Sequence, residues 1–226
     1  MNIITSQDDL VFVRAEEQDY DRILRFLMDH FRVNEPISEA VKLTEEEGMT
    51  DCFIPYMVRK SLAHSFSIIV LNGKDEIVAV YLMSVTERGN SNSSSDAEES
   101  TTEMTGGAAK IGKFLDHMED GYWELVPKSA VKLAKLEIIS VRGDQTRKGI
   151  ANKLINLDLE NLRNMGCQGI ITVASAFNSQ NLFLKNEYKI LKEVKHEDWR
   201  DENDQQIFVC PDNKTNRAIL VYKDLL

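Results

Sequence analysis

The sequence has few of the features that mark secreted, membrane-spanning or metal-binding proteins. Its longest uninterrupted apolar run covers residues 77–83, far too few to cross a membrane as a helix. The first twenty residues show no basic stretch followed by an apolar one, so we expect no secretory signal. The three cysteines, Cys52, Cys167 and Cys210, are far apart, and the four histidines do not cluster. We therefore expect no disulfide framework, no metal site, no membrane attachment and a reducing, cytoplasmic location.

The sequence also has fewer basic residues than acidic ones. The chain has 37 acidic and 27 basic residues, a formal net charge of −10. A nucleic-acid-binding protein usually needs a basic surface, so we expect no nucleic-acid partner. An acidic surface can instead concentrate cationic ligands such as amines. Apolar residues make up 42% of the chain, which is ordinary for a globular protein, and we expect a single domain over residues 1–226.

Hydrophobic periodicity predicts helices that alternate with strands through the middle of the chain, which is typical of a mixed α/β sheet. The expected helices cover residues 17–31, 51–64, 110–119, 147–165 and 179–185, with one more from about residue 37. The expected strands cover residues 11–14, 66–71, 77–85, 131–141, 170–174, 190–196, 206–210 and 218–222. Asn72-Gly73 between the second and third of these strands predicts a hairpin turn.

Residues 89–109 differ from the rest of the chain. They read GNSNSSSDAEESTTEMTGGAA, and Met104 is the only large apolar residue among them. Such a segment cannot bury enough apolar area to offset the entropy of ordering it. We expect a flexible polar loop inserted within the domain. A solvated insertion without function and a regulatory loop open to phosphorylation both agree with this composition.

The strongest local pattern is LEIISVRGDQTRKGIANKLI, which begins at Leu136. An apolar strand runs through a polar turn into a helix, and Gly149 and Ala151 keep bulk away from its first turn. The N–H groups of a first helical turn have no partner within the helix, so they suit an anionic phosphate. Arg147 and Lys148 add positive charge. The glycine spacing fits neither a P-loop nor GxGxxG, and a purely structural strand–turn–helix agrees with the pattern equally well.

The run VRGDQTRKGIANKLI resembles the acetyl-CoA signature of the GNAT superfamily of N-acetyltransferases, Gln/Arg-x-x-Gly-x-Gly/Ala, with Thr146 in its first position. The resemblance implies the GNAT fold, a central mixed and mostly antiparallel sheet flanked by helices, with a splayed strand before the cofactor helix. It also implies acetyl-CoA as co-substrate. The residues implied to bind it are Ile139, Ser140, Val141, Arg147, Lys148, Gly149, Ile150, Ala151 and Asn178.

Further segments resemble arylalkylamine N-acetyltransferases of the insect and nematode type. Asn-Glu-Pro at residues 34–36 matches a motif at the amine site, which implies that Glu35 is the general base, often through a water. Ser175 and Ser179 match a pair of serines that these relatives carry four residues apart, and both are implied to be catalytic. Phe183 replaces the tyrosine that protonates the CoA thiolate in many members. The general acid is therefore open, with Ser179 or a water as candidates.

The function implied is transfer of acetyl from acetyl-CoA to a small primary amine such as dopamine, octopamine, serotonin or tyramine. Direct transfer in a ternary complex is favoured because no cysteine lies in the cofactor motif. Two alternatives stay open: an acetyltransferase of polyamines or other small amines, and a non-catalytic acetyl-CoA-binding module. We expect a monomer or weak dimer without a metal. Phe53, Tyr56, Met57 and Trp123 are candidates for an aryl pocket, although such residues more often form plain core.

Overall fold

A computed structural model describes residues 2–89 and 103–226. Its centre is an eight-stranded sheet in the order β1-β2-β3-β4-β5-β6-β8-β7, in which β5 and β6 are parallel and the other neighbours are antiparallel. The mixed, mostly antiparallel sheet expected from the sequence is thus confirmed. The strands are β1 (Ile3–Gln7), β2 (Leu10–Arg14), β3 (Ile68–Leu71), β4 (Ile77–Glu87), β5 (Lys132–Val141), β6 (Gly169–Ala174), β7 (Lys189–Lys195) and β8 (Arg217–Asp224).

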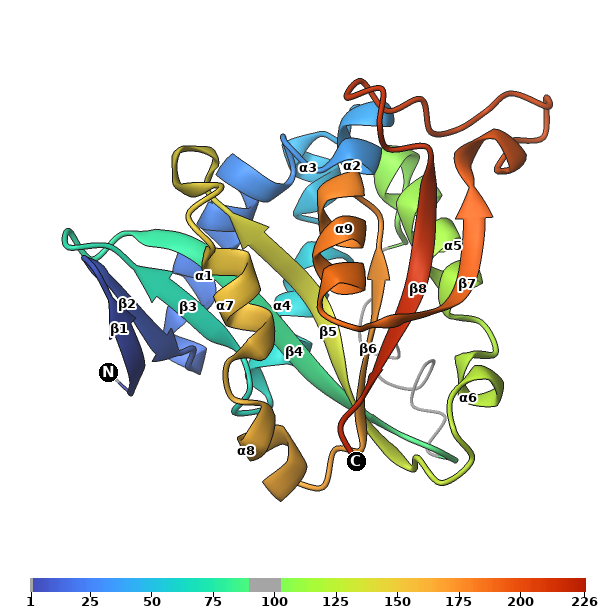
Figure 1. Ribbon diagram of the computed structural model, residues 1–226. Coiled ribbons are helices and arrows are strands. Elements are labelled where there is room, and N and C mark those ends of the chain that lie inside the picture. The colour runs from blue at the N-terminus through green and yellow to red at the C-terminus, as the bar shows by residue number, and fades with distance from the viewer. Residues whose placement is uncertain (1, 90–102) are drawn as a thin grey trace.

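Helices cover both faces of this sheet (Figure 1). One face carries α1 (Tyr20–Phe26), α2 (Pro36–Ala40), α3 (Glu45–Gly48), α4 (Ile54–Leu62), α5 (Gly106–Glu119) and α6 (Tyr122–Leu125). The other carries α7 (Ile150–Asn156), α8 (Leu159–Asn164) and α9 (Phe177–Lys185). Each face has its own hydrophobic core. We call them the α1–α6 face and the α7–α9 face.

Several boundaries differ from the sequence prediction for identifiable reasons. The helix predicted over residues 147–165 is divided into α7 and α8 at Asp158, whose φ is +70° and whose carboxylate forms an ion pair with Arg14 at 2.5 Å. The strand predicted over 206–210 is wrong. Phe208 is buried and Val209 is 68% exposed, so side chains do alternate between buried and exposed. Within the described chain, however, the segment forms only an isolated bridge through Gln206.

The loop predicted over residues 89–109 lies mostly outside the described residues, which exclude 90–102. Its last four residues belong to α5, which begins at Gly106 rather than at residue 110. Glu47 of α3 accepts a hydrogen bond from the N–H of Gly107 at 3.0 Å. Met104 packs against the core of the α1–α6 face. The helix starts early because a side chain distant in sequence binds its first turn, and a local pattern does not contain that information.

Gly169 opens β6 and offers a test of the sheet packing. A Cβ at this position would lie 2.7 Å from Cζ of Tyr222 on the neighbouring strand β8. We expect Gly169→Ala to lower the free energy of unfolding by about 1–3 kcal/mol, the usual cost of overpacking, measured by denaturant titration. Gly73→Ala is the matched control, because no atom lies within 4 Å of a Cβ there. Equal stability of the two variants would contradict the β6–β8 packing.

Candidate active site

The two central strands separate partway along their length. Residues 133–135 of β5 pair with residues 169–171 of β6, and within the described chain the ladder ends there. Beyond it, the hydroxyl of Thr172 still donates to the carbonyl of Leu136 at 2.9 Å. Residues 139–141 pair with β4 on one side, and no strand of the described chain pairs with them on the side towards β6. Buried backbone groups need hydrogen-bond partners, so this edge can accept an extended ligand.

A β-bulge in β5 accompanies the separation. Leu82 of β4 pairs with Ile138 and Met83 pairs with Leu136, so Glu137 is an extra residue without a partner in the ladder. A bulge bends its strand and increases the local twist. The bend at Glu137 lies immediately before residues 139–141 and helps direct them away from β6.

The turn after β5 has the geometry expected of an anion site. Arg147 has φ +62° and Gly149 has φ +80°, a region that non-glycine residues seldom occupy. Arg147, Lys148 and Gly149 are exposed, whereas Ile150 is buried in the core of the α7–α9 face. The N–H groups of the first turn of α7 have no helical partner. The cofactor residues expected here are therefore arranged around one exposed, basic turn.

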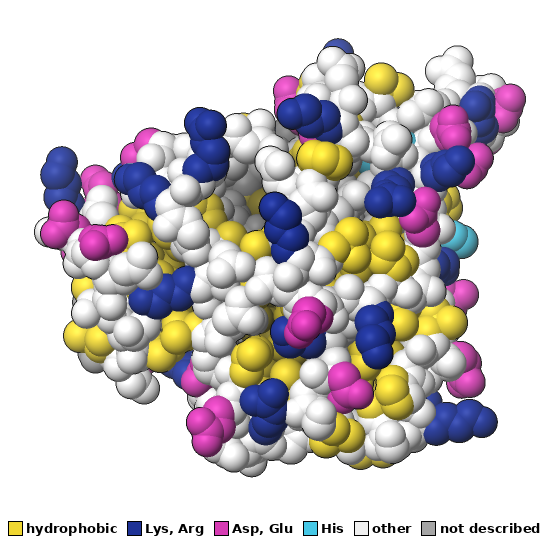
Figure 2. Space-filling view, in the orientation of Figure 1, with side chains coloured by type: hydrophobic (Ala, Val, Ile, Leu, Met, Phe, Trp, Pro, Cys, Tyr) yellow, Lys and Arg dark blue, Asp and Glu magenta, His cyan; other side chains and the backbone are white. Residues whose placement is uncertain are grey.

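The molecular surface is hollowed between α7 and α9, and Lys and Arg side chains lie on the rim of the hollow (Figure 2). Asn178, the second residue of α9, is exposed at the start of that helix. The overall charge of −10 thus coexists with a basic rim at the candidate phosphate site.

Glu35 lies between the π-helical segment Leu27–Phe31 and α2. It is the N-cap of α2, and Pro36 occupies the first helical position. Although it is an acid, Glu35 is only 7% exposed. Its Oε2 accepts from the backbone N–H of Ser38 at 2.7 Å, and its Oε1 accepts from the hydroxyl of Ser175 at 2.8 Å. The structure therefore brings two of the three expected catalytic residues into direct contact.

Burial raises the pKa of Glu35 above its ordinary value, and hydrogen bonds from Ser38 and Ser175 lower the pKa in part. A carboxylate with a raised pKa is a better proton acceptor near neutral pH than an exposed one. The third expected residue, Ser179, donates instead to the carbonyl of Ala176 at 2.8 Å. This hydrogen bond is local to the start of α9, so among the described residues Ser179 is not connected to Glu35 by hydrogen bonds.

Phe183, at the position where a proton-donating tyrosine was expected, and the nearby Tyr188 are both buried in the core of the α7–α9 face. Phe183 is 1% exposed and its ring packs against Tyr188, with centroids 5.0 Å apart. The hydroxyl of Tyr188 is buried without a hydrogen-bond partner in the described part of the chain. Burial also raises the pKa of Tyr188, which keeps its hydroxyl protonated. Tyr188 is therefore a packing residue in this structure.

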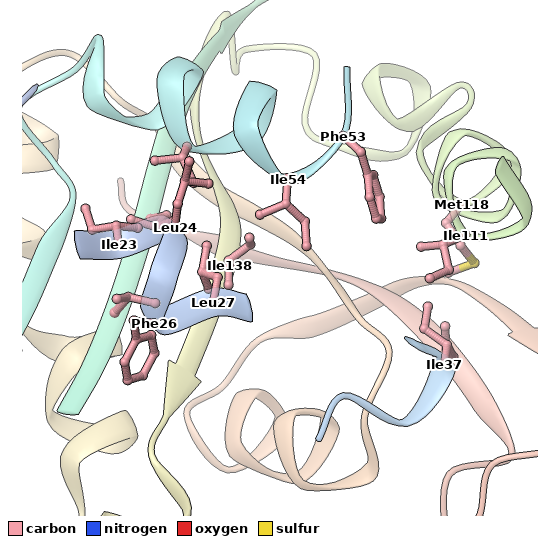
Figure 3. Close-up of a cluster of buried hydrophobic side chains, with 14 of the residues drawn as sticks. Ile23, Leu24, Phe26, Leu27, Ile37, Phe53, Ile54, Ile111, Met118 and Ile138 are labelled. Carbon is pink, nitrogen blue, oxygen red and sulfur yellow. The ribbon is translucent and has the colours of Figure 1, made fainter. Parts of the chain in front are cut away.

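Apolar side chains extend towards one another above the splayed strands on the α1–α6 face (Figure 3). They are Ile37 from α2, Phe53 and Ile54 at the start of α4, Ile111 and Met118 from α5, and Ile138 from β5. Of the four residues considered for an aryl pocket, Phe53 belongs to this group. Trp123 instead packs against the guanidinium of Arg88, 4.8 Å from its ring centroid.

Sequence reasoning missed two groups of residues near this site. Cys210 and His196 form one, with Sγ and Nδ1 3.6 Å apart. Burial raises the pKa of Cys210 to about 12, and the charge of Glu35 adds to the shift. Burial lowers the pKa of His196 to about 4. The pair is thus neutral at pH 7. Cys210 lies in an irregular segment, so the sequence gave no local signal for this pair.

The second missed group is a set of charged side chains on the α1–α6 face: Lys60, Glu119, Lys135 and Glu137. Lys135 and Glu137 interrupt an otherwise apolar strand in the sequence LAKLEIIS. Charged residues at alternate positions of a central strand were the available signal for this buried cluster.

Among residues 2–89 and 103–226, no three His, Cys, Asp or Glu side chains are grouped so that they could hold a metal ion. Across the same residues, no helix combines the length and apolar character needed to span a bilayer.

The splayed parallel pair, the turn after β5 and the flanking helices together form the fold of the GNAT N-acetyltransferases. Among solved structures, arylalkylamine N-acetyltransferase 2 from Aedes aegypti matches with a TM-score of 0.83 and 23% identity, over 97% of this chain and 100% of that chain. A Drosophila melanogaster polyamine N-acetyltransferase matches with a TM-score of 0.75 and 14% identity, over 96% and 100%. No protein-family model matches the chain, and no curated protein matches it.

The contact between Ser175 and Glu35 can be tested by titration. We expect Ser175→Ala to raise the pKa of Glu35 further, because the variant loses a hydrogen bond that stabilises the carboxylate. The measurement is a carboxyl ¹³C NMR titration of Glu35. Ser179→Ala is the control and should leave the pKa unchanged, since its hydroxyl binds Ala176. Equal effects of both substitutions would contradict the contact.

Proposed function

We propose that this protein is an acetyl-CoA-dependent N-acetyltransferase of small primary amines, with arylalkylamines as its acceptors. The observation that carries the proposal is the buried carboxylate of Glu35 on Ser175, at the end of β6 beside the point where the central strands separate. The fold supports it, because solved proteins with this fold include arylalkylamine and polyamine N-acetyltransferases.

The residues expected to hold acetyl-CoA fit the ligand in two ways. The unpaired edge of residues 139–141 offers backbone donors and acceptors to an extended, amide-containing arm. The exposed turn with Arg147, Lys148 and Gly149 offers positive charge and free N–H groups to phosphates. When bound, acetyl-CoA supplies the acetyl group as a thioester.

Glu35 is proposed to act on the amine. A primary amine is mostly protonated at pH 7 and must lose a proton before it attacks a carbonyl. The Glu35 carboxylate first attracts the ammonium and then accepts a proton from it, directly or through a water. In the overall reaction an N–C bond forms, the thioester C–S bond breaks, and the departing sulfur takes up a proton. A non-catalytic acetyl-CoA-binding module would not need a buried carboxylate here.

Acetyl-CoA binding is tested at Gly149. We expect Gly149→Glu to weaken acetyl-CoA binding at least tenfold, about 1.4 kcal/mol, because it places negative charge at the phosphate site. Isothermal titration calorimetry measures this. Gly149→Asn is the control, because asparagine tolerates a positive φ and no atom lies within 4 Å of a Cβ at this position. Unchanged affinity in folded Gly149→Glu would overturn the site.

The role of Glu35 is tested with Glu35→Gln. The amide can still cap α2 through its oxygen but cannot accept the proton. We expect acetyl-CoA affinity to be retained while turnover falls by about 10²–10⁴ at neutral pH, the usual effect of losing a general base. The deficit should shrink as pH rises, since more amine is then already deprotonated.

Glu39→Gln is the matched control, because Glu39 is an exposed acid on the same short helix, and its turnover should equal that of the unaltered protein. In the unaltered protein, activity should fall as the pH drops through the raised pKa of Glu35, because the carboxylate then becomes protonated. Near-normal turnover of Glu35→Gln from pH 6 to 9 would leave Glu35 as a helix cap only.

A further inference from the structure

A cluster of four charged side chains lies within the α1–α6 face. Nζ of Lys60 is 3.2 Å from Oε1 of Glu137. Nζ of Lys135 is 2.6 Å from Oε2 of Glu119 and 3.5 Å from Oε2 of Glu137. The hydroxyl of Ser84 donates to Oε1 of Glu137 at 2.5 Å. The Glu137 side chain is only 7% exposed, so a carboxylate is held inside the protein by two ammonium groups.

The cluster is charged but balanced. The positive charges of Lys60 and Lys135 lower the pKa of Glu137 against the opposing effect of burial. The carboxylates of Glu137 and Glu119 raise the pKa of Lys135 in the same way. Lys135 and Glu137 are therefore both ionised at neutral pH, and the cluster pairs two basic side chains with two acidic ones. A buried ion pair is often no more stabilising than apolar residues of the same size. A contribution to stability alone therefore does not explain why charged side chains occupy this position.

The bulge brings Ile138 to the same face as Glu137, which ordinary strand alternation with Leu133 already places on the α1–α6 face. Leu136 belongs to the core of the α7–α9 face, whereas Ile138 belongs to the core of the α1–α6 face. Glu137 contacts Lys60 of α4 and Lys135, so it lies on the same side as Ile138. Two consecutive side chains thus face the apolar group of Figure 3, one of them charged.

Strand register gives the level of Glu137 along the sheet relative to the candidate catalytic pair. Lys135 is level with Ile171 on β6, and Ser175 is four residues further along. Alternation puts Ile171 and Ser175 on one face, the face on which Ser175 contacts Glu35. Glu137 is two residues beyond Lys135, whereas Ser175 is four residues beyond Ile171. Along the strand direction, Glu137 therefore lies about two residues before the level of Ser175. That is ~7 Å along the strand, about the reach of an arylethylamine.

Lys60 reaches the same face from α4 through its ion pair with Glu137. It lies on α4, the helix whose first residue Ile54, together with Phe53, extends over the splayed strands (Figure 3). Its Nζ is 5.9 Å from the ring centroid of Tyr56. The Lys60 ammonium therefore occupies the space between an aromatic ring and the Glu137 carboxylate.

We propose that the Lys60–Glu137 ion pair makes the acceptor site select amines whose far end is uncharged. The inference rests on the proposed function, and it distinguishes arylalkylamines from diamines and polyamines as acceptors. A second ammonium on the acceptor would meet the ammonium of Lys60, which is only partly exposed, and like charges at close range repel. Without Lys60, the cluster would carry one surplus negative charge, and the far ammonium of a diamine could take the place of Nζ beside Glu137.

Two acceptors of equal length test this directly: hexylamine and pentane-1,5-diamine differ only in a terminal methyl or ammonium group. We expect the unaltered protein to prefer hexylamine by at least tenfold in kcat/KM, measured as CoA release. Lys60→Met should move this ratio at least tenfold towards the diamine. Propane-1,3-diamine, which is too short to reach Glu137, should gain nothing.

Glu137→Gln in the Lys60→Met background should restore the preference for hexylamine, because the surplus carboxylate is then gone. Arg59→Met is the matched control: it removes the neighbouring cation of α4, which is paired with Asp51 at 2.8 Å on the surface, and should not change the ratio. Lys60→Gln provides a second neutral variant in case Lys60→Met is unstable, and the melting temperature of each variant is recorded.

The outcomes separate the two proposals. Acetylation of amines with the same ratio in all variants would overturn the role of Lys60 and Glu137 and leave the proposed function intact. If no variant acetylates any amine, the proposed function fails. Calorimetric binding of the two amines in the presence of CoA then decides the selectivity, and equal affinities in the unaltered protein and Lys60→Met would overturn it.

Discussion

The parallel strands β5 and β6 remain paired over residues 133–135 and 169–171 and then diverge, and the candidate site is arranged around that divergence. The bulge at Glu137 bends β5 while its other edge stays paired with β4. Residues 139–141 consequently expose backbone groups in the middle of a sheet, where such groups are normally paired. The turn after β5 and the end of β6 that carries Ser175 lie on either side of the opening, so one local departure from regular pairing positions both halves of the site.

The two buried acids on the α1–α6 face have opposite electrostatic surroundings. Glu35 receives hydrogen bonds from Ser38 and Ser175, and burial dominates, so its pKa is raised. Glu137 is placed between two ammonium groups, and its pKa is lowered. Groups whose surroundings push their pKa values apart are suited to different roles. Glu35 is poised to exchange a proton, whereas Glu137 holds a fixed charge and can act on a ligand only through the cations that surround it.

Much of the fold was predictable because its signals are local. The β3–β4 hairpin follows from Asn72-Gly73, and the turn before α7 follows from the residues up to Gly149. The α5 start, where the N–H of Gly107 donates to Glu47, and the break at Asp158, which pairs with Arg14, depend on partners distant in sequence. The residues of the candidate site also divide into those with a local sequence signal and those that depend on distant partners. A resemblance indicated Glu35 and Ser175, whereas the charged cluster also needs Lys60 of α4 and Glu119 of α5, which are distant in sequence from Glu137.

The limited pairing between β5 and β6 also bears on how the molecule fluctuates. Strands β1–β5 form one continuous antiparallel ladder and β6–β8 form another. A short stretch of parallel pairing joins them, and so does α5, which contacts β6, β7 and β8 and forms an ion pair with Lys135 of β5 through Glu119. Regions joined by few bonds tend to open as separate cooperative units. Amide hydrogen exchange would then resolve two foldons, and a ligand seated between the splayed strands would act as a reversible cross-link that couples their opening.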